Sequence, residues 1–123
     1  MTEQTPWLLI DAGNTAIKWR LANAEGLLDT GGSVSDVVSL CRRVEAEPWS
    51  VAALASVASD ATDAELMSAL TAGKEATVHR AAAQTTCLGL VSSYDEPERM
   101  GVDRWLAMLS ANFHNEGALC VID

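Results

Sequence analysis

The stretch that decides the fold lies near the start of the chain and reads Ile10-Asp11-Ala12-Gly13-Asn14-Thr15-Ala16-Ile17-Lys18. It joins two apolar runs, residues 7–10 and 16–21, through a short turn centred on Gly13 and Asn14. Both runs have the length of a strand, and glycine and asparagine tolerate positive φ. The pattern therefore predicts a β-hairpin.

The chemistry of this turn suits a phosphate group. Asp11 would end the first strand and Lys18 would lie on the second. Such a turn can aim several backbone N–H groups into one concavity, a buried-strand aspartate suits a hydrated metal ion, and a lysine adds a positive charge. A plain turn, with Asp11 capping local N–H groups and Lys18 solvated, is the simpler alternative. The whole pattern D-x-G-N-T-x-x-K favours phosphate, although it is neither a Rossmann fingerprint nor a P-loop.

Composition limits the class of protein. The 123 residues suit one domain, or one half of a two-lobed protein. The net charge of −9, from 17 acidic and 8 basic residues, argues against a nucleic-acid or anionic-membrane partner. The three cysteines are far apart, and the polar N-terminus carries no export signal. We therefore expect reduced thiols and a cytoplasmic protein without a membrane span.

Downstream of the hairpin, helices and strands alternate. A third strand is predicted at 27–30 and ends where Gly31-Gly32 breaks the sheet. The later elements are a helix from a capping box at 33–36 to about 45, ended by Pro48, a strand at 51–57, a helix from 59–62 to Gly73, a strand at 76–80, a structureless segment at 81–101, a helix at 102–114 and a strand at 118–122.

This order predicts an α/β fold. Three meandering strands followed by alternating helices and strands indicate a mixed sheet of five to six strands with helices packed on it. The last strand ends at Asp123, as the first ends near Asp11, and there the chain stops. We therefore expect a fragment. His79 is predicted to be a satisfied or edge histidine rather than a ligand.

A second chemical stretch, Met100-Gly101-Val102-Asp103-Arg104-Trp105, opens the helix predicted at 102–114. A carboxylate at Asp103 can accept a proton from a substrate hydroxyl, and the guanidinium of Arg104 can grip a carboxylate with two hydrogen bonds. On spacing alone, a helix-terminal acid and a surface arginine are the favoured alternative. Val102, Trp105, Leu106 and Leu109 are predicted to share the inner face. Tyr94, the single tyrosine, either lines a pocket or is an exposed loop residue.

Three stretches together resemble the type III pantothenate kinases, a family that includes the Bvg accessory factor proteins. They are residues 11–18, 101–105 and 121–123. The resemblance implies the actin-like (ribonuclease H-like) fold of acetate and sugar kinases, in which two lobes close around ATP. Residues 1–123 would be the N-terminal, ATPase-like lobe. The implied reaction is ATP-dependent phosphorylation of pantothenate, the first step towards coenzyme A.

The resemblance also implies roles for particular residues. The ATP phosphates would be bound by the segment Asp11, Ala12, Gly13, Asn14, Thr15, Ala16, Ile17 and Lys18, with Asp11 near magnesium. Pantothenate would be bound by Tyr94, Gly101, Val102, Asp103 and Arg104, and Asp103 would be the general base. Asp123 would be a ligand of an activating monovalent cation, potassium or ammonium. Members of the family are homodimers, so the full-length form is expected to be one.

One departure from the family pattern is large. The family's third motif continues past the aspartate that Asp123 matches, and here it is cut. Because the second lobe is missing, we expect little or no kinase activity from the 123-residue chain alone. Two alternatives stay open: a non-catalytic accessory factor of the same fold, and a kinase of the same superfold that acts on another small molecule.

Overall fold

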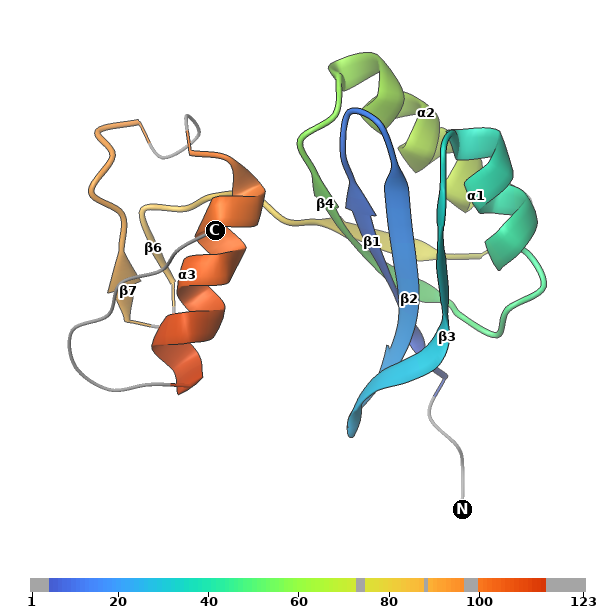
Figure 1. Cartoon of the computed structure of the whole chain (residues 1–123), viewed down its shortest axis with the longest axis horizontal. Helices are drawn as coiled ribbons and strands as arrows, with labels where there is room; N and C mark the ends of the chain where they lie inside the picture. The colour runs from blue at the N-terminus through green and yellow to red at the C-terminus, as the bar shows by residue number, and fades with distance from the viewer. Residues whose placement is uncertain (1–4, 73–74, 88, 97–99, 115–123) are drawn as a thin grey trace. The chain divides into compact units, whose positions relative to one another are not determined.

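The hairpin predicted at the start of the chain forms the middle of a sheet. The structure is a computed structural model that describes residues 5–72, 75–87, 89–96 and 100–114 (Figure 1). Strand β1 (Trp7–Ala12) pairs antiparallel with β2 (Ile17–Asn23) in the register Ala12 to Ile17. Residues 13–16 connect the two strands, so the predicted hairpin is confirmed with a four-residue loop.

The third strand is longer than the sequence predicts. Strand β3 (Gly26–Val34) runs through Gly31 and Gly32 and pairs antiparallel with β2, so the predicted break in the sheet is wrong. A Cβ at Gly31 would lie 2.6 Å from the carbonyl oxygen of Trp19 on β2. The glycines therefore let the two backbones approach closely, which is the other use of glycine within a strand.

Two crossover connections, each containing a helix, complete the sheet. Helix α1 (Val37–Val44) leads to β4 (Val51–Ser56), and α2 (Asp60–Thr71) leads to β5 (Thr77–Arg80). Strands β1, β4 and β5 are parallel, and the sheet order is β3-β2-β1-β4-β5. The predicted mixed α/β sheet is confirmed with five strands. The sixth predicted strand, 118–122, lies outside the described residues.

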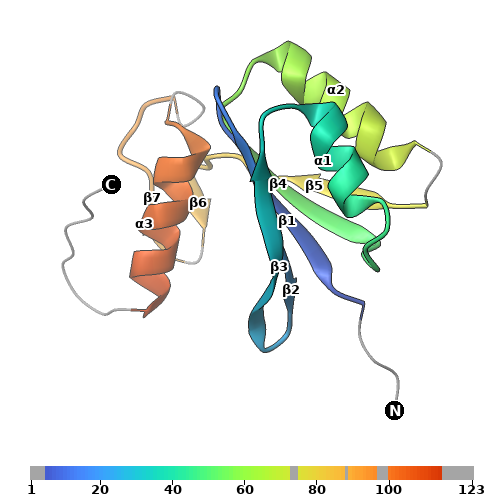
Figure 2. The same ribbon diagram turned by 45° about the vertical axis from the view of Figure 1, so that its right-hand side comes forward.

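The core lies on one face of this sheet. Along β1, β2 and β4 the side chains alternate, and the buried ones include Leu8, Trp19 and Leu54. Leu40 of α1 and Leu66 of α2 are fully buried in the same cluster. Figures 1 and 2 show α1 and α2 side by side on that face. The opposite face carries the exposed side chains of β1 and β2.

The helix starts differ in part from the prediction. Helix α1 begins after Asp36, whose side chain accepts a hydrogen bond from the Ser39 N–H at 2.7 Å. The capping box expected at 33–36 is wrong because β3 continues through Val34 and takes Ser33 into the strand. Helix α1 also ends at Val44, before Pro48. Helix α2 begins after Ser59, which caps it as predicted.

A second compact unit, Ala81–Asp123, follows the first, Met1–Arg80. It contains a small hairpin of β6 (Thr86–Cys87) and β7 (Leu90–Val91) in the segment predicted to be structureless. Gly89, with φ of 84°, explains the hairpin because it supplies the left-handed turn residue.

Helix α3 (Val102–His114) matches the predicted range. Trp105 is 1% exposed, as expected for a core residue, whereas Leu106 is 37% exposed and does not belong to the inner face. Residues 102, 105, 106 and 109 have the i, i+3, i+4, i+7 spacing of one helix face, and at about 100° per residue 105 and 106 lie at its opposite edges. The buried stripe is therefore centred towards Trp105, and Leu106 lies at its exposed border. No helix in the described part of the chain is long and apolar enough to cross a membrane.

Candidate functional site

The first candidate site is the turn between β1 and β2. Gly13 donates its N–H to the carbonyl oxygen of Ala16 at 2.9 Å, which closes the four-residue loop. Asn14 and Thr15 form its exposed tip. The expected positive φ is absent from Gly13; among the described glycines it occurs at Gly26 and Gly89. A four-residue loop does not need a left-handed glycine at this position, because the change of direction is spread over more φ and ψ angles than in a two-residue turn.

Two charged side chains flank the base of the turn. Asp11 and Lys18 are paired across β1 and β2, directly before the last pair of the hairpin, Ala12 and Ile17. Both side chains are exposed, although β1 is the middle strand of the sheet. Asp11 belongs to the face of the sheet that α1 and α2 leave uncovered, since its neighbours Ile10 and Ala12 are buried on the other face.

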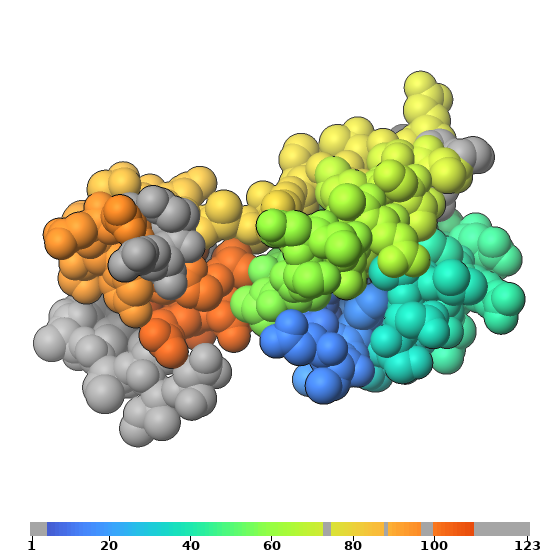
Figure 3. Space-filling view, turned by 90° about the horizontal axis from the view of Figure 1, so that it is seen from above, coloured from blue at the N-terminus to red at the C-terminus, as the bar shows by residue number. Residues whose placement is uncertain are grey.

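A recess of about 160 Å³ lies beside the turn. The turn contributes one wall, and the others come from the junction of β3 with α1 and from the first turns of α2. Figure 3 shows the blue atoms that include the turn at the surface, bordered by the teal atoms near α1 and the green atoms of β4 and α2. The lining residues are Gly13, Asn14, Thr15, Ala16, Ile17, Ser35, Asp36, Val37, Thr62 and Glu65.

Asp36, Thr62 and Glu65 were not predicted as site residues. They lie far from the turn in the sequence and form no motif with it, so only the packing of α1 and α2 brings them there. The hydrogen bond from the backbone N–H of Ser39 lowers the pKa of Asp36, with a smaller contribution from the Ser39 side chain. Asp36 therefore keeps its negative charge at neutral pH at one edge of the recess.

A second candidate site lies in the second unit, at the start of α3. Asp103 and Arg104 are exposed in its first turn, as predicted, whereas Val102 is only 7% exposed. One carboxylate oxygen of Asp103, Oδ1, accepts a hydrogen bond from the backbone N–H of Arg104 at 2.9 Å. A Cβ at Gly101 would lie 2.7 Å from that oxygen, so the absence of a side chain there leaves room for the carboxylate.

Tyr94 joins this cluster. The guanidinium of Arg104 donates from Nη1 to the hydroxyl oxygen of Tyr94 at 3.2 Å, and both side chains are exposed. The structure thus brings together three residues that the sequence interpretation assigned to one substrate: Tyr94, Asp103 and Arg104. Their hydroxyl, carboxylate and guanidinium groups are able to hydrogen-bond a polar ligand that carries a hydroxyl and a carboxylate.

The described residues offer few protein ligands for a metal ion. Within the described residues, no group of three or more histidine, cysteine, aspartate or glutamate side chains could hold a metal ion. Magnesium often keeps several waters and takes one or two carboxylates together with the phosphates of a substrate. The single exposed carboxylate of Asp11 fits that kind of site. Asp123, the predicted ligand of a monovalent cation, lies outside the described residues.

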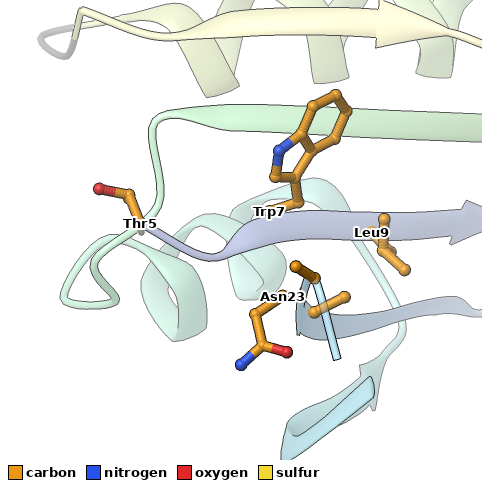
Figure 4. A pocket seen from close by; sticks show the side chains of 6 residues that line it. Thr5, Trp7, Leu9 and Asn23 are labelled. Carbon is orange, nitrogen blue, oxygen red and sulfur yellow. The ribbon is translucent and has the colours of Figure 1, made fainter. Parts of the chain in front are cut away.

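A separate groove of about 580 Å³ lies on β1 and β2, at the end of the hairpin away from the turn (Figure 4). Trp7, 44% exposed, forms one wall, and its ring stacks on His79 of the edge strand β5 with ring centroids 5.8 Å apart. The edge position predicted for His79 is confirmed. The lining residues are Thr5, Trp7, Leu9, Ala22, Asn23 and Ala24.

Comparisons with known proteins agree on one family. The family model described as type III pantothenate kinase matches residues 7–123. The type III pantothenate kinase of Marinobacter nauticus is 39% identical over 119 residues, which cover 94% of this chain and 48% of the relative. That of Alcanivorax borkumensis is 34% identical over 124 residues, covering 94% and 49%.

A third relative, the type III pantothenate kinase of Halorhodospira halophila, is 32% identical over 133 residues, covering 94% of this chain and 50% of its own length. The chain spans about half the length of the curated relatives it matches. The five-stranded mixed sheet agrees with the actin-like fold expected from the resemblance. On this match over nearly its whole length, the chain belongs to the type III pantothenate kinase family.

Proposed function

We propose that residues 1–123 contribute the N-terminal, ATPase-like lobe of a two-lobed kinase that phosphorylates pantothenate with ATP. The product would be 4'-phosphopantothenate, the first intermediate on the way to coenzyme A. The observation that carries this proposal is the family match over residues 7–123, together with the surface turn that Asp11 and Lys18 flank.

In this proposal the turn binds the phosphates of ATP. The tip residues Asn14 and Thr15 are exposed, so their backbone N–H groups are accessible to phosphate oxygens. Lys18 supplies a positive charge at the base of the turn, and Asp11 holds a hydrated magnesium ion beside it. Magnesium, when bound, neutralises charge that develops on the transferred phosphoryl group.

The cluster at the start of α3 binds pantothenate. Asp103 orients the primary hydroxyl and accepts its proton as the oxygen attacks the γ-phosphorus, while the bond from phosphorus to the bridging oxygen breaks and ADP leaves. Arg104 binds the pantothenate carboxylate, because a guanidinium can donate two parallel hydrogen bonds to it. Tyr94 contacts the substrate and steadies Arg104 through their hydrogen bond of 3.2 Å. Gly101 and Val102 supply the backbone on which this cluster is built.

The resemblance to the family also suggests a bound cation and an oligomeric state. We propose a monovalent cation, potassium or ammonium, with Asp123 as a ligand, and a homodimer for the full-length form. A cytoplasmic location is proposed from the widely spaced cysteines, of which Cys41 and Cys87 are free thiols.

The test is release of ADP that requires both ATP and pantothenate, measured with magnesium and with potassium or ammonium. The assay uses the 123-residue chain and the longest polypeptide that its gene encodes, each beside its Asp103→Asn variant. Turnover in the longer polypeptide that is lost in the variant is the expected result. A protein that binds ATP but does not respond to pantothenate would overturn the substrate assignment.

A further inference from the structure

Three polar side chains meet at the carboxyl edge of the five-stranded sheet. Ser56 ends β4, Arg80 ends β5, and Asp63 lies in the first turn of α2. Asp63 is buried, with 5% of its surface exposed. The Ser56 hydroxyl donates to one carboxylate oxygen, Oδ1, and the Arg80 guanidinium donates from Nη2 to the other, Oδ2, at 2.6 Å. Both oxygens of a buried carboxylate are therefore satisfied, as burial requires.

The same cluster reaches the end of β1. Ser56 lies beside Ala12 in the parallel pair of β4 and β1, and Ala12 is the last residue before the turn. The next residue, Val57, donates its N–H to the carbonyl oxygen of Ala12 at 2.9 Å. The Ser56 hydroxyl oxygen also accepts the N–H of Ala58 at 3.1 Å, so it holds the start of the connection to α2.

Helix α2 also lies beside the β1–β2 turn. Thr62 and Glu65, which lie on either side of Asp63 in the sequence, line the recess together with residues 13–17 of the turn. The carboxylate of Asp63 is bonded to the last residues of β4 and β5. It therefore also fixes the position of the start of helix α2 relative to the β1–β2 turn. The turn thus has β2 on one side and, on the other, β4 and α2.

Stability alone is a weak reason for such a cluster. A buried ion pair is often no more stabilising than apolar side chains of the same volume, because both charges lose their hydration. Its hydrogen bonds, however, define one geometry for the groups they join. A site that is held in its binding geometry before the ligand arrives loses less entropy on binding.

We infer that Asp63 is a positioning residue, which acts through Ser56 and the bond from Val57 to Ala12 to hold the β1–β2 turn in its ligand-binding shape. This inference rests on the proposed role of the turn in binding the phosphates of ATP. Asp63 itself does not touch the nucleotide. Arg80 serves as its counter-charge, half-exposed at the surface end of the pair.

The experiment measures amide hydrogen exchange by NMR in the ligand-free 123-residue chain, for Asp63→Asn, Ser56→Ala and the control Asp60→Asn. Asp60 is an exposed carboxylate in the same first turn of α2, so the control makes the same chemical change outside the cluster. The reporting amides are Val57 and Gly13, which donate to Ala12 and Ala16. The amide of Leu40, which donates to Asp36 in α1, is the internal reference.

The expected result is exchange about tenfold faster at Val57 and Gly13 in Asp63→Asn and in Ser56→Ala, with Leu40 unchanged and with no effect in Asp60→Asn. The double variant should exchange no faster than Asp63→Asn, because both changes break one connected path. Equal acceleration at Leu40 would mean loss of stability throughout the unit and would overturn the inference. Unchanged exchange at both reporting amides would overturn it as well.

A second measurement separates this inference from the proposed function. Titration with ATP and magnesium follows the amide signals of Asn14 and Thr15 in the longest polypeptide that the gene encodes, and Asp63→Asn should weaken binding by about tenfold relative to Asp60→Asn. If that polypeptide without substitutions does not bind ATP while the exchange result holds, the proposed function fails and the positioning role of Asp63 stands. If binding is normal in Asp63→Asn, the positioning role fails and the function stands. The milder Ser56→Ala variant keeps the test valid if Asp63→Asn does not fold.

Discussion

Asp11 and Lys18 lie directly opposite each other on β1 and β2, next to the last residue pair before the turn. Opposite residues of an antiparallel pair point to the same side of the sheet, with Cβ atoms about 4.5–5.5 Å apart. Both side chains are exposed. A carboxylate and an ammonium group therefore lie on the same side of the sheet at the base of one turn.

Replacing Lys18 by alanine should weaken binding of ATP with magnesium by about tenfold, because a hydrogen bond between charged groups is lost. Arg20→Ala is the matched control, since Arg20 is exposed on the same strand and the same face but further from the turn. Isothermal titration calorimetry measures both dissociation constants. Equal losses in the two variants would show that only general positive charge matters.

The Asp103→Asn variant should lower kcat by about 100-fold or more and leave ATP binding unchanged, because an amide cannot accept the proton of the substrate hydroxyl. Asp95→Asn removes another exposed carboxylate of the same unit and serves as the control. Steady-state ADP release by the longest polypeptide that the gene encodes measures kcat. If Asp103→Asn retains normal kcat, Asp103 is not the base.

Arg104→Gln should raise KM for pantothenate by about tenfold while KM for ATP stays constant, since a charge-assisted pair with the substrate carboxylate is lost. Arg104→Lys should recover only part of the loss, because lysine is a point charge without the planar fork of arginine. Arg42→Gln, on the exposed side of α1, is the control. A change in KM for ATP alone would reassign Arg104 to the nucleotide.

Gly31→Ala should destabilise the first unit by about 1–3 kcal/mol, because the added Cβ would lie 2.6 Å from a backbone oxygen that cannot move alone. Ser33→Ala, an exposed position on the same strand, should stay within about 0.5 kcal/mol. Urea unfolding followed by tryptophan fluorescence gives both free energies. Tolerance of alanine at Gly31 would mean that β3 does not approach β2 as described.

Lowering the pH should reduce the free energy of unfolding, because the carboxylate of Asp36 becomes protonated. Its pKa is lowered in the folded state by the N–H of Ser39, so its contribution is present above the unfolded pKa and is lost as pH falls through the folded pKa. Asp36→Asn keeps an N-cap that does not titrate. Melting temperatures between about pH 5 and pH 2 should therefore fall less steeply in Asp36→Asn than in the unmodified chain. The exposed Asp29→Asn variant is the control, and equal slopes in all three proteins would contradict the prediction.

Local patterns predicted most of the first unit. The hairpin, the cap at Ser59 and strands β4 and β5 follow from apolar periodicity and from capping residues, which act over a few neighbouring positions, and so does helix α3 of the second unit. The errors have the same origin. Glycine ends strands in many sequences, so Gly31 and Gly32 predict a break, and only their pairing with Arg20 and Trp19 shows that they permit close contact between strands.

The sequence by itself determined the order of the helices and of the strands in the five-stranded sheet, the D-x-G-N-T-x-x-K and Gly-x-Asp-Arg stretches, and through them the family. Tertiary structure alone decided that Asp11 is exposed, that Tyr94 bonds to Arg104, and that Asp63 joins Ser56 to Arg80. The physical reason is distance along the chain. Propensity and periodicity describe how a residue interacts with its near neighbours, whereas these contacts join residues from separate elements and form only when strands pair and helices pack.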